Sequence, residues 1–224
     1  MSSEKQTSGL LRLTGLTPVG RGSHRVCYRH PDHPDRCVKV LIVNVPGKAM
    51  TDQRIAAGPA SFRPVVDENT LELETYGELE RTGNPAIWNH IPRCHGMVET
   101  DCGPGLCIDY VTGPDGMPAE SLTQRIERNY DASCRKALED LKNFLLKHLV
   151  RIGDLHQSNL LIRGVPGEGR ERIYIIDGLA DRHFLWWRCF YPVRRFKVRR
   201  KIQRMEFRIR VQHELAEKSK ASPA

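Results

Sequence analysis

A short polar stretch, GDLHQSN at residues 153–159, limits the choice of fold more than any other part of the chain. Before it, residues 130–150 place apolar side chains three and four positions apart, which predicts an amphipathic helix buried on one face. After it, two apolar runs flank the Gly-rich turn at 165–170 and predict a β-hairpin. A polar loop fixed between a buried helix and a hairpin is a candidate functional site.

Three residues of this stretch and one at the far end of the hairpin could act together. An antiparallel hairpin returns Asp177 to the neighbourhood of Asn159, which would bring together two oxygen ligands of the kind that Mg²⁺ prefers. Asp154 would orient a hydroxyl group and accept its proton. His156 would either contact a transferring phosphoryl group or brace the loop. An Asp at a strand end before Gly is also common in ordinary turns.

The first half of the chain predicts another hairpin, in which RVCYRH and RCVKVLIV flank the turn PDHPD. Gly20 and Gly22 come just before it. Because glycine has no Cβ, backbone N–H groups at these positions could approach a phosphate closely. Two glycines before a strand also suit a plain turn.

Lys39 lies in the second strand of that hairpin, between apolar neighbours. It would face solvent on a half-buried strand, or it would face inward and bind phosphate. The inward arrangement needs a carboxylate to hold the ammonium group. The helix predicted in ENTLELETYGELERT, residues 68–82, offers Glu72, with Glu74 and Glu78 as competitors.

RCHGMVET and GLCIDYVT predict a further strand pair, followed by the linker GPDGMP. Strands and one helix, then a hinge, a long helix and a hairpin indicate an α+β fold in two lobes. The expected organisation is a disordered leader at 1–10, an N-lobe at 11–113, a minimal C-lobe at 114–187, a basic helical segment at 188–215 and a disordered tail at 216–224.

The net charge of +8 belongs to one segment. Residues 188–210 hold ten Lys or Arg and one Glu, a balance of +9, which leaves the rest of the chain near −1. Its apolar side chains at helical spacing predict an amphipathic helix: Val198, Ile202, Met205 and Ile209. The apolar side would complete the core of the C-lobe, or the helix would lie on an anionic membrane surface. Nucleic-acid binding is the weaker alternative.

No stretch approaches 18 consecutive apolar residues, and the N-terminus has no apolar run long enough for a signal peptide. The sequence therefore predicts a cytoplasmic protein, and seven scattered cysteines also suit a reducing compartment. Cys94, Cys102 and Cys107, with His90 and His95, would form an alternative zinc site, but their gaps do not match the usual paired spacing.

In this order the elements resemble the protein-kinase-like superfamily: a Gly-rich hairpin, a strand Lys, a helix Glu, a hinge, a loop with D-x4-N and a strand-end Asp. GDLHQSN is similar to the catalytic loop G-D-x-H-x-x-N of aminoglycoside phosphotransferases. More narrowly, GRGSHRVCYRHPD, RCVKV and IPRCHGMVETDCGPG resemble YrbL-type proteins of the bacterial PhoP regulatory network, and the likeness covers most of residues 15–180.

The resemblance implies an α+β, two-lobed protein-kinase-like fold with a reduced C-terminal lobe, and ATP and Mg²⁺ as cofactors. It implies that Asp154 and His156 are catalytic and that Asn159 and Asp177 hold the metal. The remaining candidates would bind the nucleotide: Gly20, Gly22, Lys39, Glu72, Asp109 and Val111.

Three positions depart from the kinase pattern. Arg25 stands at the third Gly of the Gly-rich loop, where it would stiffen the loop and add charge near the phosphates. Ile152 replaces the usual His of the catalytic loop, which removes a brace, and Gly178 stands where kinases have Phe. Only 47 residues follow Asp177, which predicts little room for peptide-docking helices and favours a small or lipid-like acceptor.

The sequence thus predicts a kinase-like phosphotransferase that acts on a small or lipid-like hydroxyl acceptor, such as a glycolipid, in a bacterial envelope-stress or magnesium-response context. One alternative is a nucleotide-binding pseudokinase that regulates a partner. The other is an anion- or lipid-binding adaptor that acts through the basic segment. The expected location is cytoplasmic, with peripheral attachment at the inner membrane as a variant of it.

Overall fold

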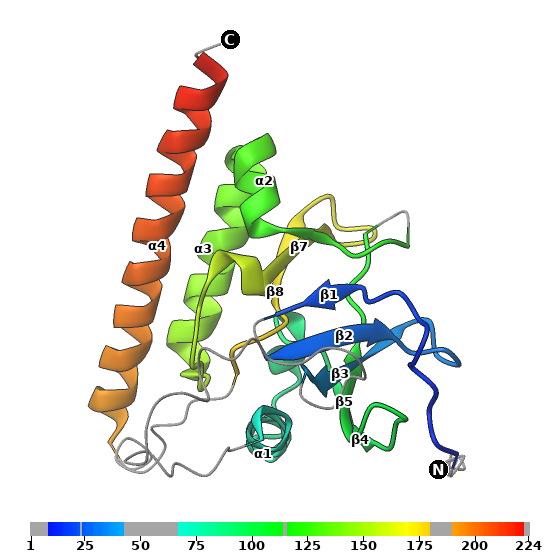
Figure 1. The fold of residues 1–224 in the computed structure, drawn as a ribbon. Helices are drawn as coiled ribbons and strands as arrows, with labels where there is room; N and C mark the ends of the chain where they lie inside the picture. Colours follow the sequence, from blue (N-terminus) through cyan, green and yellow to red (C-terminus); the bar gives the residue numbers. More distant parts are fainter. Residues whose placement is uncertain (1–8, 23, 43–66, 114–115, 180–189, 222–224) are drawn as a thin grey trace, which may run out of the picture. The chain divides into compact units, whose positions relative to one another are not determined.

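The computed structural model describes residues 9–22, 24–42, 67–113, 116–179 and 190–221 (Figure 1). The chain forms two compact units, one made of residues 1–73 and 94–110 and the other of 74–93 and 111–224. The sequence predicts one continuous N-lobe at 11–113, but in the structure residues 74–93 of this range belong to the second unit. Most of the expected leader at 1–10 lies outside the described residues.

The first unit is built on a five-stranded antiparallel sheet of order β1-β2-β3-β5-β4. Its strands are β1 (Gly20–Arg21), β2 (Arg25–Arg29), β3 (Arg36–Leu41), β4 (Cys94–Val98) and β5 (Gly105–Asp109). The hairpin expected around PDHPD is the β2–β3 pair, and the later strand pair is β4–β5. The helix α1 (Glu68–Glu80) begins in this unit and ends in the second.

One face of this sheet packs on a buried apolar cluster to which Val26, Val38 and Val40 contribute. Gly105 is paired with Val40 across β3 and β5. A Cβ atom at Gly105 would lie 2.4 Å from Val38 Cγ1 and 3.1 Å from Val40 Cγ1. The two valines therefore fill the space that a side chain at this position would need.

Replacing Gly105 by Ala is expected to lower the free energy of unfolding by about 1–3 kcal/mol, because the added methyl group overpacks the two valines. Urea unfolding followed by circular dichroism measures this loss. Gly164→Ala is the matched strand variant, since a Cβ there meets no atom within 4 Å. Equal losses in the two variants would contradict the close-packing explanation.

The second unit contains a three-stranded sheet of order β6-β7-β8. Its strands are β6 (Glu120–Ser121), β7 (Leu160–Gly164) and β8 (Glu171–Ile175). Its helices are α2 (Leu122–Arg128), α3 (Ala132–His148) and α4 (Tyr191–Ala221), with short 3-10 turns at Pro85–Asn89 and Gln157–Asn159. The β7–β8 hairpin is the one expected after the polar loop.

Helix α3 corresponds to the amphipathic helix expected within residues 130–150. Asp131 caps its N-terminus by accepting a hydrogen bond from the Cys134 N–H at 2.9 Å, and Leu149 ends it in the left-handed conformation with φ of 48°. The adjacent α2 was missed, although the sequence SLTQ contains the capping box that Ser121 and Gln124 form at its N-terminus.

Helix α4 forms most of the basic segment expected at 188–215, of which residues 188 and 189 lie outside the described part. The four apolar residues singled out for it, Val198, Ile202, Met205 and Ile209, are all buried. Helix α4 packs alongside α2 and α3 within the second unit (Figure 1). It continues to Ala221, so residues 216–221 are helical where a disordered tail was expected; residues 222–224 are not described.

The expected α+β class is confirmed, and the described elements follow the kinase-like order of hairpin, Lys strand, Glu helix, strand pair, long helix, polar loop and hairpin. Within the described residues, no helix is long and apolar enough to cross a membrane.

The cysteines of the alternative zinc site are buried or half-buried in the first unit. Burial raises the pKa of the Cys107 thiol to about 11, which keeps it protonated near neutral pH. Among the described residues, no group of three or more His, Cys, Asp and Glu side chains is placed to hold a metal ion.

Candidate functional site

The first part of the candidate site is a buried ion cluster of Arg25, Lys39, Asn69 and Glu72, called here the Glu72 cluster. The Glu72 carboxylate is fully buried, and its Oε1 accepts a hydrogen bond from Lys39 Nζ at 2.8 Å. Lys39 is only 6% exposed, so it faces inward rather than toward solvent. A buried carboxylate loses its hydration and needs such partners to remain charged.

Arg25 is the second cation on this carboxylate. Its Nη1 donates to Glu72 Oε2 and, at 3.3 Å, to Asn69 Oδ1. Arg25 was expected to add charge near the phosphates, but its guanidinium is buried and paired with Glu72. The β2–β3 register could have indicated this, because Arg25 and Lys39 lie on the same face of the hairpin.

Asn69 connects α1 to the strand that carries Lys39. Its Nδ2 donates to the Lys39 carbonyl oxygen at 2.9 Å, and its side chain is fully buried. Of the three glutamates that could pair with Lys39, only Glu72 is placed to do so on α1. Glu72 is buried beside Lys39, whereas Glu74 is exposed and Glu78 Oε1 lies 3.6 Å from Arg151 Nη1.

The other four nucleotide-binding candidates, Gly20, Gly22, Asp109 and Val111, lie outside the Glu72 cluster. Gly20 and Gly22 are exposed in and after β1, and the Gly22 N–H donates to the Arg25 carbonyl at 2.9 Å. The Asp109 carboxylate pairs with His95 Nε2 at 2.7 Å. Val111 is buried in the second unit, where its carbonyl accepts a hydrogen bond from Ala119.

Glu72→Gln is expected to lower the free energy of unfolding by about 3–5 kcal/mol, because it leaves the buried cations Lys39 and Arg25 without their shared carboxylate. Chemical denaturation measures the loss. Glu74→Gln removes an exposed carboxylate from the same helix and is expected to change stability by less than about 0.5 kcal/mol. A small loss for Glu72→Gln would show that the cluster is not held by this charge.

The second part of the candidate site is the loop at residues 151–159 in the second unit. The Asp154 carboxylate is largely exposed, with a side chain 62% accessible. His156 braces the loop, since the Ser158 N–H and Oγ lie 3.2 and 2.7 Å from its Nδ1 at the start of the 3-10 turn. Of the two roles that the sequence left open for His156, the structure therefore shows the bracing contact.

The hairpin brings the chain of Asp177 back to Asn159. Leu160 is paired with Ile175, and one step further the Ile176 N–H donates to the Asn159 carbonyl at 3.0 Å. The Asp177 Oδ1 accepts a hydrogen bond from the Gly178 N–H at 2.7 Å. Asn159 comes just before β7 and Asp177 just after β8, so the two residues lie at the same end of the hairpin, as the hairpin prediction required.

Gly178 packs directly against the backbone of Asp154. Its carbonyl accepts hydrogen bonds from the N–H groups of Gly153 and Asp154 at 2.6 and 3.3 Å. Gly178 has φ of +82°, and a Cβ there would lie 2.2 Å from the Asp154 carbonyl oxygen. This contact explains why glycine stands where kinases have Phe: no side chain fits between the two segments.

Helix α4 supplies a brace for the same loop. Lys201 Nζ donates to the carbonyls of Ile152 and, at 2.9 Å, Gly153, and Arg194 Nη2 donates to the Leu149 carbonyl at 3.0 Å. Arg208 Nη1 lies 3.6 Å from Asp154 Oδ1. Helix α4 thus contacts the loop at Ile152 and Gly153, which the sequence did not reveal.

Gly178→Ala is expected to displace the loop at Asp154, because the new methyl group cannot share space with the Asp154 carbonyl. Gly167→Ala is the matched control, with a similar φ of +74° but no atom within 4 Å of the added Cβ. Both variants carry backbone strain of about 1–2 kcal/mol, and Gly178→Ala should lose more. Hydrogen exchange at the Gly153 and Asp154 amides should rise only in Gly178→Ala; equal exchange in both variants would contradict the contact.

The candidate residues thus fall into two groups. The structure brings Lys39 together with Glu72 in the first unit, and it brings Asp154, His156, Asn159 and Asp177 into one loop and hairpin of the second. The donor set of the second group suits Mg²⁺, which takes oxygen ligands and is commonly held by one or two carboxylates together with substrate phosphates. With an amide and a single carboxylate from the chain, a nucleotide would have to complete the ligand set.

Comparisons with known proteins agree with the narrower resemblance. Residues 11–212 match the family described as PhoP regulatory network protein YrbL. The protein named Uncharacterized protein YrbL from Escherichia coli (strain K12) is 33% identical over 156 residues, which cover 68% of this chain and 65% of that protein. The protein of the same name from Shigella flexneri gives the same figures. The aligned part of the chain thus spans 65% of the length of these curated relatives.

The chain also aligns with solved kinase structures. The PK-1 kinase of Cydia pomonella granulovirus is 20% identical, with 73% of this chain and 50% of that chain covered and a TM-score of 0.40. The Rio2 kinase of Chaetomium thermophilum, solved as an ADP/Mg²⁺-phosphoaspartate complex, is 13% identical, with 82% and 51% covered and a TM-score of 0.43. The PknI kinase domain of Mycobacterium tuberculosis is 14% identical, with 78% of this chain and 64% of that chain covered and a TM-score of 0.39.

Proposed function

The chain belongs to the PhoP regulatory network protein YrbL family, and from this membership and the geometry of its candidate site we propose that it is an ATP- and Mg²⁺-dependent phosphotransferase. The observation that carries the proposal is the buried ion pair between Lys39 Nζ and Glu72 Oε1 at 2.8 Å. A lysine held on a strand by a helix carboxylate is the device that kinases use to bind nucleotide phosphates.

Each candidate residue has a role in this proposal. Lys39, fixed by Glu72, contacts the nucleotide phosphates, and Asn159 and Asp177 hold Mg²⁺, which neutralises phosphate charge when bound. Asp154 orients the acceptor hydroxyl, and its exposed carboxylate receives the proton. His156 keeps the loop in shape through Ser158.

The transfer itself is a single displacement. The acceptor oxygen forms a bond to the terminal phosphorus of ATP while the bond from that phosphorus to the ADP oxygen breaks. ADP leaves with the electron pair, and the hydroxyl proton passes to Asp154. Most of the catalytic effect would come from positioning and charge neutralisation.

The proposed acceptor is a small or lipid-like molecule with a hydroxyl group, used in a bacterial envelope-stress or magnesium-response context. After Asp177, the described residues form one helix, α4, which exposes arginines as well as apolar side chains. A lipid-like acceptor accords with a cytoplasmic location and peripheral attachment at the inner membrane. The outer side of α4 exposes Phe196, Phe207 and Val211 among arginines, a composition that suits anionic lipid.

A second candidate function is a nucleotide-binding regulatory module that performs no transfer. Two contacts favour it: Arg208 lies 3.6 Å from the proposed base Asp154, and Arg25 shares Glu72 with Lys39. Both place an additional cation on a carboxylate that the transfer reaction needs. An adaptor that acts through α4 alone would require neither Lys39 nor Asp177.

Calorimetry with Mg·ATP and a turnover assay for ADP release test these proposals. The wild-type protein should bind Mg·ATP, and Lys39→Met should weaken this binding by about tenfold or more. In Asp177→Asn, the affinity for ATP should no longer depend on Mg²⁺. Asp154→Asn should bind normally and lose turnover. Glu74→Gln is the control and should behave as wild type in both assays.

The outcomes separate the candidates. Absence of Mg·ATP binding by wild type would overturn both nucleotide-dependent functions and leave the adaptor. If the wild-type protein binds Mg·ATP without releasing ADP, and Asp154→Asn binds it equally well, the regulatory module would be favoured.

A further inference from the structure

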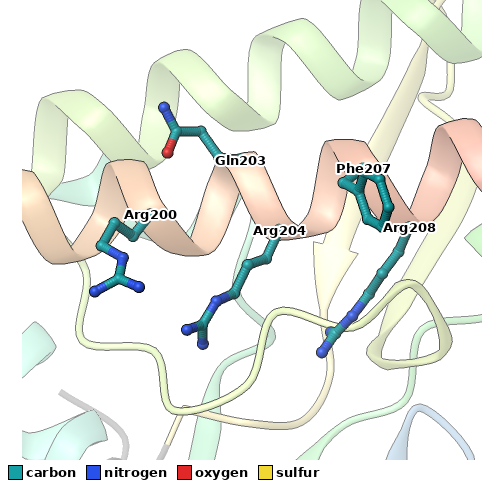
Figure 2. Close-up of a pocket in the computed structure, with 5 residues that line it drawn as sticks. All are labelled: Arg200, Gln203, Arg204, Phe207 and Arg208. Carbon is teal, nitrogen blue, oxygen red and sulfur yellow. The ribbon is translucent and has the colours of Figure 1, made fainter.

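Helix α4 carries on its exposed side an open, shallow cavity of about 400 Å³ that is lined by five exposed residues of this helix: Arg200, Gln203, Arg204, Phe207 and Arg208. Figure 2 shows the guanidinium groups of Arg200, Arg204 and Arg208 on the same side of the helix, one turn apart from each other. This follows from the sequence spacing, because residues four positions apart lie above one another on a helix.

The charges of these arginines are poorly compensated. Among the described residues, no carboxylate lies within ion-pair distance of Arg200 or Arg204, and Arg208 has only the longer 3.6 Å contact with Asp154. The nearest glutamate along the helix, Glu206, pairs with Lys142 at 2.6 Å. Like charges four residues apart destabilise a helix by about 0.2–0.5 kcal/mol a pair, so this row of arginines is unfavourable until an anion binds.

Arg208 connects the cavity to the loop that carries Asp154. Its Nη1 is 3.6 Å from Asp154 Oδ1, and Lys201, three residues before Arg204, donates to the carbonyls of Ile152 and Gly153. The loop and this part of α4 therefore form one connected structure. An anion in the cavity would lie next to the carboxylate proposed to receive the acceptor proton.

We propose that the cavity binds a phosphate group carried by the acceptor itself, so that the substrate class is a phosphorylated hydroxyl compound. Guanidinium groups match phosphate oxygens in a bidentate geometry, and an arginine row offers this along its length. The exposed ring of Phe207 provides an apolar wall for the carbon part of the ligand. The assignment of the acceptor rests on the proposed phosphotransferase function; the phosphate site itself does not.

The same phosphate chemistry is found on a soluble phosphomonoester and on a lipid headgroup. Two probes distinguish these sources: glycerol 3-phosphate in solution, and phosphatidylcholine vesicles that contain phosphatidic acid. Inorganic phosphate serves as the minimal probe. Calorimetry measures the soluble probes and co-sedimentation measures the vesicles, in each case with the full-length chain.

Arg204→Gln should weaken phosphate binding by about tenfold, because it removes the central arginine without touching Asp154. Arg199→Gln is the matched control, since Arg199 is an exposed arginine of α4 that does not line the cavity. It should change binding by less than about twofold, as expected when one charge of a long-range field is lost.

The outcomes are separable from those for the nucleotide. Binding of glycerol 3-phosphate or of vesicles that is lost in Arg204→Gln but kept in Arg199→Gln supports the site and identifies its source. Equal losses in the two variants, or no binding of any probe by wild type, would overturn it. Mg·ATP affinity should be the same in wild type and Arg204→Gln, so a failure of nucleotide binding counts against the phosphotransferase and not against the cavity.

Discussion

The fully buried carboxylate of Glu72 is the interaction on which the first unit depends. A carboxylate without water is stable only when cations and donors replace its hydration, and here Lys39 and Arg25 do so from neighbouring strands of one hairpin. Asn69 then ties the helix backbone to the same strand through the Lys39 carbonyl. Sheet and helix are thus joined by polar contacts at the place where a phosphate-binding lysine is expected, which makes the fold and the candidate site inseparable there.

The loop at residues 151–159 in the second unit is held mainly through contacts to its backbone groups. Gly178 closes on Asp154 from the hairpin side, and Lys201 satisfies carbonyls from α4. These contacts use backbone atoms of the loop, and the exposed Asp154 carboxylate lies 3.6 Å from Arg208 Nη1. Lys201 of α4 contacts this loop at Ile152, the position where the sequence departs from the kinase pattern.

The parts of the fold predictable from the sequence are those set by local pattern. Strand alternation and turn residues indicate the β2–β3 and β7–β8 hairpins, and helical spacing indicates α3 and the buried residues of α4. The pairing of Lys39 with Glu72 followed from motif order. The contact of Lys201 with Ile152 joins residues 49 positions apart and leaves no periodic signal. The prediction that Arg25 adds charge near the phosphates was wrong. It relied on the position of Arg25 in the Gly-rich motif and overlooked that Arg25 shares a face of the hairpin with Lys39.

The position of α4 in the chain has a consequence for how the protein is made. The loop around Asp154 emerges from the ribosome before Arg194, Lys201 and Arg208, which hold it. Until those residues follow, the carbonyls of Ile152 and Gly153 lack the Lys201 ammonium group, and the contacts between α3 and α4 are not yet made. The second unit therefore acquires its final loop geometry only after α4 has been synthesised. A nascent chain released before that stage would carry the proposed catalytic residues without the helix that holds their loop.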